Sequence, residues 1–444
     1  MNTTNEWVEK IGQSITLKVI TIGFLTLVLL IPGFMIQNLI TERKSRSEET
    51  IEKINEKWSK SQTVNGPVLA VPFTIVETDE NNKPVPLKHW MYITPEMLNI
   101  KAKLFPEVRY YGIYKTILYK SELQVSGYFS KIDTQKFGKA AIHWEEAYFS
   151  VGVSDLRGIT NNIEFTLDGT KYHAEAAGNS EIDSSAKGLN IFPKNADLLQ
   201  SGKPLNFNFN LSLKGSSDLN FIPLGKNTKV QLGGAWKSPG FIGNFSPEYK
   251  LSENSFSADW NVLAFNRNIP EMWIDRENIP FKDISFGVNL VDTVDQYQQN
   301  MRSAKYALMF IGLTFVVFFF VEILTHKRIH PIQYLLVGIA LVLFYSLLLS
   351  LSEQIGFSRA YLIASVATIL LITTYAHSIF KNILQTGILA SILGMLYIFL
   401  FVILQLEDIA LLIGSVGLFI ILGIIMYFSK KIVWYKQREE IKAD

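Results

Sequence analysis

The chain has 444 residues and no cysteine. Without cysteine there is no disulfide framework, no thiolate metal site and no cysteine nucleophile. The absence is compatible with an oxidising compartment, where a stray thiol is a liability, but it does not select one. An excess of basic residues is also lacking, because 42 Lys and Arg against 40 Asp and Glu leave a net charge of +2. A nucleic-acid partner needs a basic face, so we expect none.

Motifs for nucleotide binding or hydrolysis are absent as well. The sequence contains no GxxxxGK[ST], no GxGxxG after a strand, no HExxH and no GxSxG. The six histidines are scattered, and His326 and His330 have no evident third ligand beside them. Clusters of Ser, Asp and Gly at 154–158 and 215–218 are typical of turns between strands rather than of nucleophile loops. We therefore predict no cofactor, no metal and no enzymatic activity; a membrane-linked hydrolase is the most distant alternative.

What the sequence has instead is long apolar runs. The first covers 15–40, and five more cover about 304–324, 332–352, 360–379, 385–405 and 409–428. Each has the length of about 20 residues that a helix needs to cross a bilayer. A cleaved signal peptide is the competing interpretation of the first run. It continues through Pro32 without a small-x-small cleavage pattern, which favours an uncleaved anchor with a kink or helix adjustment at Pro32.

Between the first and second runs the sequence changes character. Residues 41–64 are charged and helix-prone, with Ile51, Ile54 and Trp58 on one face, which favours a helical stalk over a membrane-surface helix. Residues 65–295 contain short alternating segments punctuated by Gly, Pro, Asn and Asp. In 205–214 (LNFNFNLSLK) apolar and polar residues alternate strictly, as in a strand with one wet face. Asp168-Gly169 predicts a type I′ hairpin turn.

The predicted fold class is therefore an α+β membrane protein. One N-terminal transmembrane helix precedes a large, mostly antiparallel β domain, a sandwich or an elongated pair of sheets, and a five-helix transmembrane bundle follows it. Residues 429–444 form a tail.

Lys and Arg in the short connections predict the orientation of this chain. Lys327, Arg328, Lys381 and the tail lysines alternate with turns that carry Glu353, Glu407 and Asp408 instead. Because basic residues collect on the cytoplasmic side, both termini are predicted to be cytoplasmic and residues 41–303 periplasmic. Arg43, Lys44 and Arg46 disagree, since they follow the first run on the side predicted to be external.

Few ionisable residues lie deep in the apolar runs, and such residues are functional candidates by default. Glu322 is the best of them, as a buried acid paired with Lys327 or Arg328; the alternative is a snorkelling interfacial carboxylate. Glu353 and Arg359 flank an outer turn and are candidates to pair. His377 lies near an inner end. None lies at a bilayer midplane, where coupling sites for ions or protons are usual.

Several stretches resemble the CreD family of bacterial inner-membrane proteins. The strongest is 322–338, with His330, Pro331, Gln333 and Tyr334, followed by Leu351-Ser352-Glu353. Further likeness lies in 65–72 (NGPVLAVP), 111–114, 151–159 (VGVSDLRGI), 215–223 and 295–297, and it extends from the first run to Trp434-Tyr435. The last two apolar runs resemble the family least in sequence.

The resemblance implies a role in cell-envelope integrity and stress response, and it brings no catalytic residues. We expect an inner-membrane protein whose periplasmic β domain is a structural or interaction module for an envelope protein or cell-wall partner, with the lipid bilayer around its helices. The alternative is a transporter or lipid-handling protein that uses the helix bundle. A cavity lined by Glu322, His377, Thr373 and Thr374 would support that alternative.

Overall fold

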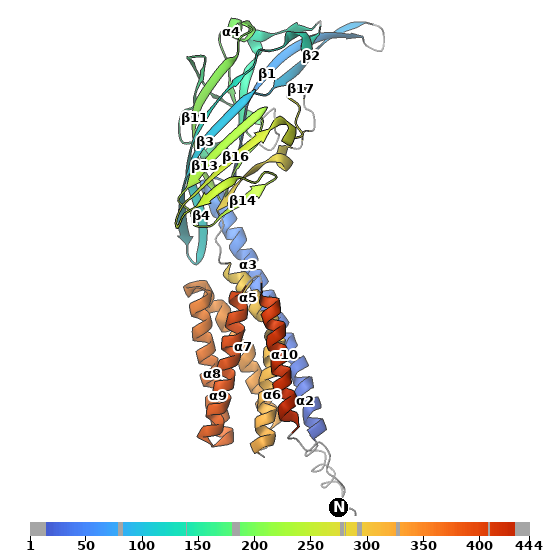
Figure 1. Cartoon of the computed structure of the whole chain (residues 1–444), viewed down its shortest axis with the longest axis vertical. Helices are drawn as coiled ribbons and strands as arrows, with labels where there is room; N and C mark the ends of the chain where they lie inside the picture. The colour runs from blue at the N-terminus through green and yellow to red at the C-terminus, as the bar shows by residue number, and fades with distance from the viewer. Residues whose placement is uncertain are drawn as a thin grey trace, which may run out of the picture. The chain divides into compact units, whose positions relative to one another are not determined.

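The computed structural model describes residues 15–78, 83–138, 140–179, 187–275, 279, 281–290, 295–325, 329–406 and 409–430. The chain forms two compact units. We call Met1–Ser47 with Val294–Asp444 the helical unit, and Glu48–Thr293 the β unit. Figure 1 shows both units.

The helical unit is built from long apolar helices and one short polar helix, α5. These are α2 (Ile15–Val28), the first part of α3 (Leu30–Trp58), α5 (Gln296–Lys305), α6 (Ala307–Thr325), α7 (Pro331–Ile355), α8 (Phe357–Phe380), α9 (Ile383–Gln405) and α10 (Ala410–Ser429). Among the described residues, five helices are long and apolar enough to cross a membrane, and there are six when α5 and α6, bent by 46° to one another, are counted as one span. The predicted class, one N-terminal span and a C-terminal bundle around a β region, is confirmed.

The first span carries the predicted adjustment near Pro32. Its helix is interrupted at Leu29, between α2 and α3. Pro32 has no N–H to donate to the carbonyl of Val28, so the regular ladder lacks a bond at this point. The N–H of Leu29 still donates to Leu25 and that of Gly33 to Leu29, at 3.0 and 3.2 Å, so the two helices continue one another.

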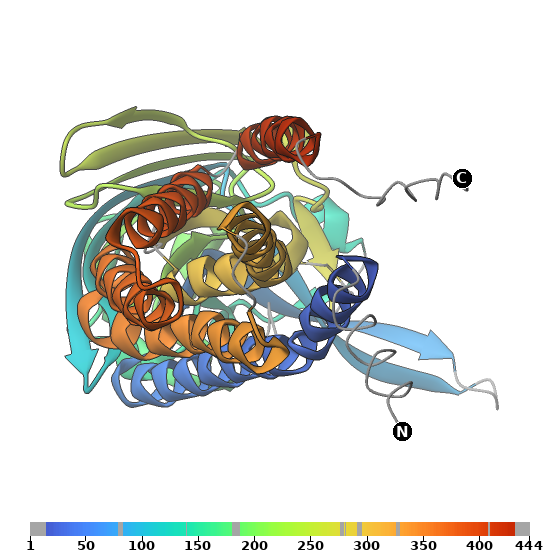
Figure 2. The ribbon, with the colours of Figure 1, turned by 90° about the horizontal axis from the view of Figure 1, so that it is seen from below.

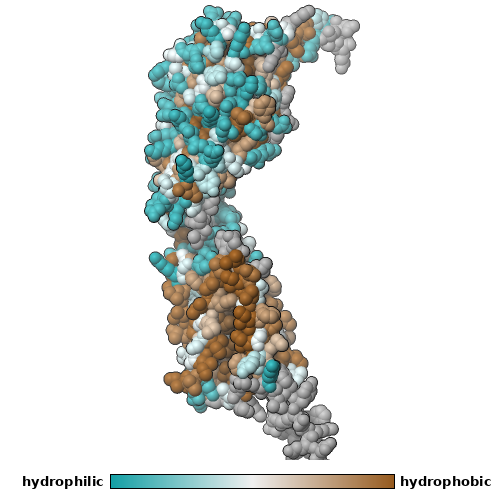
Figure 3. All heavy atoms as spheres, in the orientation of Figure 1, coloured by the Kyte–Doolittle hydropathy of each residue, from teal (hydrophilic) through white to brown (hydrophobic). Residues whose placement is uncertain are grey.

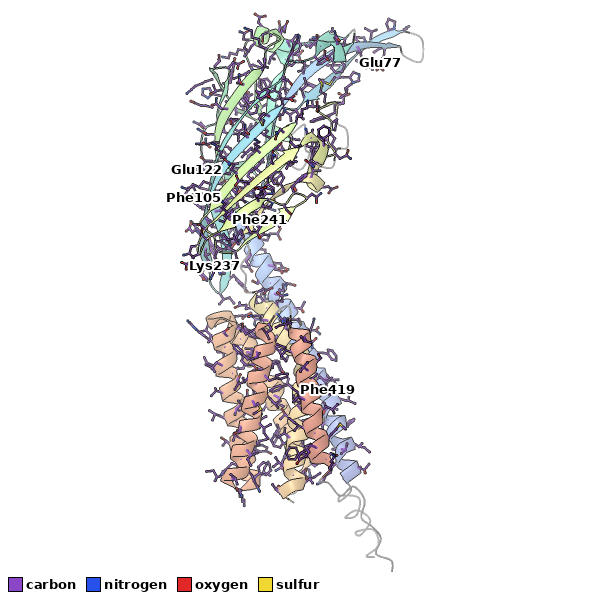
Figure 4. All side chains as sticks on the ribbon, viewed as in Figure 1. Glu77, Phe105, Glu122, Lys237, Phe241 and Phe419 are labelled. Carbon is purple, nitrogen blue, oxygen red and sulfur yellow. The ribbon has the colours of Figure 1, made fainter. Side chains whose placement is uncertain are left out.

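The helices pack around α6 and an aromatic core. Figure 2 looks along them and shows α6 bordered by α2, α7 and α9, while α10 stands at the edge. Phe310 of α6 packs edge-on against Tyr397 of α9, with ring centroids 4.6 Å apart, and Phe344 of α7 lies 4.9 Å from the same ring. The face of the helical unit seen in Figure 3 is mostly apolar. Phe419 on α10, labelled in Figure 4, is 78% exposed, which suits a lipid surrounding and not water.

The β unit consists of two sheets. The larger has the central order β14-β18-β12-β1-β6-β10-β9, with β2, β5 and β17 attached beside β1 and β2; the other has the order β15-β16-β13-β3-β4-β11-β7-β8. The strands of the first sheet are β1 (Gln62–Thr78), β2 (Pro84–Ile93), β5 (Ala141–Ile142), β6 (Tyr148–Val153), β9 (Glu175–Asn179), β10 (Lys187–Ile191), β12 (Asp218–Phe221), β14 (Pro239–Gly243), β17 (Met272–Ile274) and β18 (Phe286–Leu290). Those of the second are β3 (Met97–Tyr111), β4 (Tyr114–Phe129), β7 (Glu164–Leu167), β8 (Thr170–His173), β11 (Leu205–Ser216), β13 (Asn227–Gly234), β15 (Glu248–Leu251) and β16 (Phe256–Leu263). Only β1 with β12 and β3 with β13 pair in parallel; the other pairs among the described strands are antiparallel.

The core of the β unit lies between the inner faces of these sheets. Phe207 of β11 is 2% exposed and packs within 5.5 Å of Phe129 and 5.9 Å of Phe165, between ring centroids. β11 shows the predicted alternation, with its odd-numbered residues buried. β1 does not alternate: Val68 and Ala70 belong to a second cluster on its other face, with Tyr92 and Trp273. A strand buried on both faces reads as a continuous apolar run.

Asp168 and Gly169 connect β7 to β8 with φ values of 43° and 85°. Positive φ at both central residues is the type I′ geometry predicted for this pair. The Asp168 carboxylate also accepts hydrogen bonds from the backbone N–H and the side-chain amide of Asn206, at 2.9 and 3.0 Å, so the turn is tied to β11.

A buried polar junction lies where α3 ends against the β unit. Gln62, fully buried, donates to Ser59 Oγ and to the carbonyls of Asp155 and Lys214 at 2.8 to 3.1 Å, and accepts from the N–H of Asp155. Burial alone would raise the pKa of Asp155, but Arg157, whose guanidinium lies 2.8 Å away, and backbone donors hold this pKa below its usual value. The 154–158 segment is therefore a structural turn, as predicted.

Two glycines of the family-like segment make this junction possible. A Cβ on Gly152 would overlap the side-chain amide of Asn65, and a Cβ on Gly158 would overlap that of Gln62. Both side chains are buried, at 1% and 0% exposure. These glycines therefore serve the close approach of β1 and the 151–159 segment rather than any chemistry.

We predict that Gly152→Ala destabilises the protein by about 1–3 kcal/mol, the usual cost of forcing extra volume into a packed site. Gly178→Ala is the matched control, because that strand glycine has open space around it and ordinary φ. Thermal unfolding of the purified chain in detergent measures both. Equal melting temperatures for the two variants would contradict this account of the junction.

Candidate functional site

Glu322 is the most buried charged residue that the sequence singles out, with 3% of its side chain exposed. It lies near the end of α6. Its Oε1 accepts the backbone N–H of Ile329 at 3.1 Å, and its Oε2 accepts the hydroxyl of Tyr334 on α7 at 2.9 Å. The carboxylate also forms an ion pair with Lys18 on α2. One side chain thus connects three helices.

Lys18 was not among the predicted site residues. A signal for it exists in the sequence, because it is the one charged residue between 15 and 40. A lone charge within a span is costly and needs a partner. In the structure Lys18 is 31% exposed, and its ammonium group reaches Glu322, so the first span and the bundle neutralise one another's charge.

The family-like residues after Glu322 begin α7. His330 is the N-cap: its Nδ1 accepts the N–H of Ile332 at 3.3 Å, and its own N–H donates to Gln333 Oε1 at 2.9 Å. Pro331 occupies the first helical position, where its missing N–H costs nothing. The capping interpretation of His330 is therefore what the geometry supports. His326 lies outside the described residues.

Gly338 lies one turn further along α7, at the end of the 322–338 stretch, where close packing requires a glycine. A Cβ there would overlap Leu29 and press against Phe315 at 2.9 Å. Beside these contacts is a cavity of about 420 Å³ between α2, α6 and α7. Its walls are apolar, and its polar groups are those of Lys18, Thr21, Glu322, His330 and Tyr334.

Glu353 belongs to a second polar cluster, at the opposite end of α7. Its Oε1 accepts the hydroxyl of Tyr297 on α5 at 3.1 Å, and its Oε2 lies 4.0 Å from Arg43 on α3. Beside it, Asn300, 2% exposed, donates to Ser352 Oγ at 2.7 Å. These contacts fasten α3 and α5 to the end of α7.

Two of the three basic residues that disagreed with the charge rule, Arg43 and Lys44, have acidic partners here. Arg43 faces Glu353, and Lys44 lies 3.5 Å from Asp295, the N-cap of α5. The positive-inside rule counts Lys and Arg and is not a net-charge rule, so these ion pairs do not remove the vote of Arg43 and Lys44. The predicted orientation therefore rests on the connections of the five-helix bundle.

The structure brings together some of the predicted residues and not others. Glu322, His330, Pro331 and Tyr334 line one cavity, with Gln333 behind the cap; Glu353 belongs to the other cluster. Glu353 contacts Arg43 and Tyr297, whereas the pair with Arg359 is not formed. His377 bonds Thr386 at 3.2 Å, and neither it nor Thr373 or Thr374 lines the Glu322 cavity. Lys327 and Arg328 lie outside the described residues.

Comparisons with known proteins agree with these motifs. A family profile described as Inner membrane protein CreD matches residues 14–435. The chain belongs to the CreD family. Inner membrane protein CreD of Escherichia coli (strain K12) is 32% identical over 417 residues, which cover 92% of this chain and 91% of that protein.

Membership in this family of inner-membrane proteins agrees with the apolar surface of the helical unit. It also places the 322–338 stretch inside the matched region. In this CreD-family chain the stretch supplies one buried carboxylate, its tyrosine partner, a helix cap and a small residue. Within the described part of the chain, no group of three His, Asp or Glu side chains is arranged to hold a metal ion. The arrangement suits fastening helices and binding a small polar group at the cavity.

We predict that Glu322→Gln destabilises the chain by about 1–3 kcal/mol, because Lys18 and the other donors to this carboxylate lose a charged acceptor. Lys18→Met should cost stability too, and the double variant should lose less than the sum of the two, since either change alone breaks the pair. Thermal unfolding in detergent measures all three.

Thr21→Val is the matched control, because Thr21 lines the same cavity but donates only to the carbonyl of Leu17. It should melt close to the parent chain. Strictly additive losses for Lys18 and Glu322 would show that the two side chains do not interact.

Proposed function

We propose that this protein contributes to envelope integrity by holding its β unit outside the cytoplasmic membrane as an interaction module. Family membership supports the inner-membrane setting. The proposal rests chiefly on the outer face of the eight-stranded sheet, which is polar across six neighbouring strands and contains a hollow. Such a face is built for contact with something polar outside the chain, whereas the polar groups of the helical unit mainly contact one another.

The orientation rests on the charge pattern described above. Lys381 and Lys430 lie at the ends of α8 and α10 that would face the cytoplasm. With both termini on that side, an even number of crossings is required, and the six spans provide it. The β unit between the first and second crossings is then extracytoplasmic, in the periplasm of a cell with two membranes.

A lipid-handling function is the second candidate, and one observation favours it. Residues of α6, α9 and α10 line an apolar hollow of about 740 Å³. Leu313, Phe320, Ile392 and Phe428 are among its walls, and Gly417 lies against the ring of Phe399. A hollow of this size and polarity suits an acyl chain. It is separate from the Glu322 cavity, so it does not supply the polar path that a transporter of ions needs.

Site-specific photocrosslinking in intact envelopes tests the proposal. A photoreactive phenylalanine derivative replaces Lys101 on the outer face, or, as the matched control, Lys88 on β2 of the other sheet; both lysines are exposed strand residues. We expect a discrete envelope component to be captured at position 101 and not at 88, because only the former lies in the hollow.

Identical products at both positions, or none at either, would contradict an interaction module on this face. If those results were accompanied by lipid that copurifies with the parent chain and is lost in Gly417→Trp, the lipid-handling candidate would replace it.

A further inference from the structure

The outer face of the second sheet carries polar side chains in straight rows across the strands. One row crosses six strands, and each of its residues is exposed. In order of neighbouring strands the row contains Glu248, Asp259, Gln231, Lys101, Gln124 and Asn210. Adjacent strands are about 4.8 Å apart, so a polar group recurs at that interval along the row.

A second row lies two residues along each strand and is equally polar. It contains Asn261, Lys229, Asn99, Ser126, Asn208 and Thr166. On the other side of the first row, Lys103 is paired with Glu122 and Glu122 with Ser212. Rows on one face are about 6.8 Å apart, twice the rise per strand residue. We call these three rows the polar face.

The polar face is hollowed, not flat. Two adjoining hollows of about 820 and 450 Å³ lie on it and share Lys101, Gln231 and Asp259. Ser246 and Glu248, from the β15 edge, form one side of the larger hollow. These volumes are in the range of ligand-binding clefts.

Most side chains on the polar face have hydrogen-bonding capacity to spare. Gln231 donates to Asp259 Oδ1 at 3.0 Å. Among the described residues, the side chains of Lys101, Lys229 and Gln124 form no hydrogen bond or ion pair with the protein. Amides, lysines and carboxylates at fixed spacing offer both donors and acceptors, which is what vicinal hydroxyls and acetamido groups require.

Two aromatic residues lie at the ends of the polar face. Tyr128 pairs with Met97 beside the second row, and Phe105 follows Lys103 on the far side. Phe105 is 40% exposed, and Lys103 Nζ lies 5.2 Å from its ring centroid. Figure 4 shows Phe105 and Glu122 on the same side of the β unit. An exposed ring at Phe105 and a half-buried one at Tyr128 beside the polar rows suit stacking on the apolar face of a pyranose.

Other partners fit less well. A protein partner is usually gripped by a central aromatic or apolar anchor, and here the centre is polar and the aromatic residues are peripheral. A polyanion such as a nucleic acid would meet carboxylates at Glu122, Glu248 and Asp259. A row of polar groups at near-constant spacing matches instead a linear polymer with hydroxyls on every unit.

We propose that the polar face binds a linear glycan chain whose sugars lie along the rows, across the strands. The inference rests on the proposed function, since it names the ligand class of the same face. The occupant is the glycan strand of peptidoglycan, which is linear and carries a hydroxyl or acetamido group on every sugar; the branched oligosaccharide of an outer-membrane lipid does not follow straight rows. Recognition is by hydrogen bonds from the rows and by ring stacking at Tyr128 or Phe105.

The test uses the full chain in detergent and a β-1,4-linked N-acetylglucosamine hexasaccharide, titrated by calorimetry. Saturable binding is expected, and Lys101→Ala with Gln124→Ala should weaken it about tenfold or more, the effect of losing one or two hydrogen bonds to the ligand. Lys237→Ala is the matched control, because Lys237, labelled in Figure 4, is an exposed lysine between β13 and β14 and belongs to none of the three rows. It should bind as the parent chain does.

Two further arms test the source. Co-sedimentation with purified peptidoglycan sacculi, lost in the double variant, supports the cell-wall source; binding of the de-acylated lipid oligosaccharide without co-sedimentation with sacculi contradicts it. No saturable binding to any of the three probes overturns the glycan inference, as does equal binding by the double variant. If position 101 still crosslinks a protein in that case, the interaction module stands and only its ligand class is wrong.

Discussion

The ion pair between Lys18 and Glu322 joins two parts of the chain that are 304 residues apart in sequence. A carboxylate and an ammonium group are each costly to remove from water, and each is tolerated at membrane depth when paired and further hydrogen-bonded. Tyr334 and the N–H of Ile329 supply those additional bonds. The first span is thereby selected as a member of the bundle, although the whole β unit lies between them in sequence.

A second polar contact repeats this arrangement at the other end of α7. Arg43 and Tyr297 meet Glu353, so the helix that leaves the bundle toward the β unit and the helix that returns from it are fastened to one residue. The β unit is thus an insertion whose two connections are both held.

Much of this architecture could be predicted because it follows from strong periodicities. Apolar runs of spanning length, the alternation in β11 and the Asp168-Gly169 turn are local signals, and the structure has each of them. The contacts that these ionisable side chains make in the folded structure were harder to predict. Glu322 was predicted to pair along the chain, but its described cation is Lys18, and Glu353 contacts Arg43 rather than Arg359. A local sequence pattern does not indicate which distant helix packs against a given residue.

The close-packed glycines and the polar face are two further features that the sequence alone does not predict. Gly152, Gly158 and Gly338 stand in the family-like stretches, and only the packed structure explains them as points of close approach. The rows of the polar face depend on strand order and register, which bring β15, β16 and β13 beside β3 although they are far away in sequence. A single alternating strand predicts a wet face but not a binding surface.

The central claim is that the β unit and the helix ends near Lys381 lie on opposite sides of the membrane. The lack of cysteine makes a direct measurement possible, since any introduced thiol is unique. Lys237→Cys and Lys381→Cys variants of the full chain would be exposed, in cells with a permeabilised outer membrane, to a maleimide that cannot cross the inner one. We predict labelling at position 237 in these cells and labelling at 381 only after the inner membrane is opened. The reverse pattern would contradict the orientation, and with it the proposed role in the envelope.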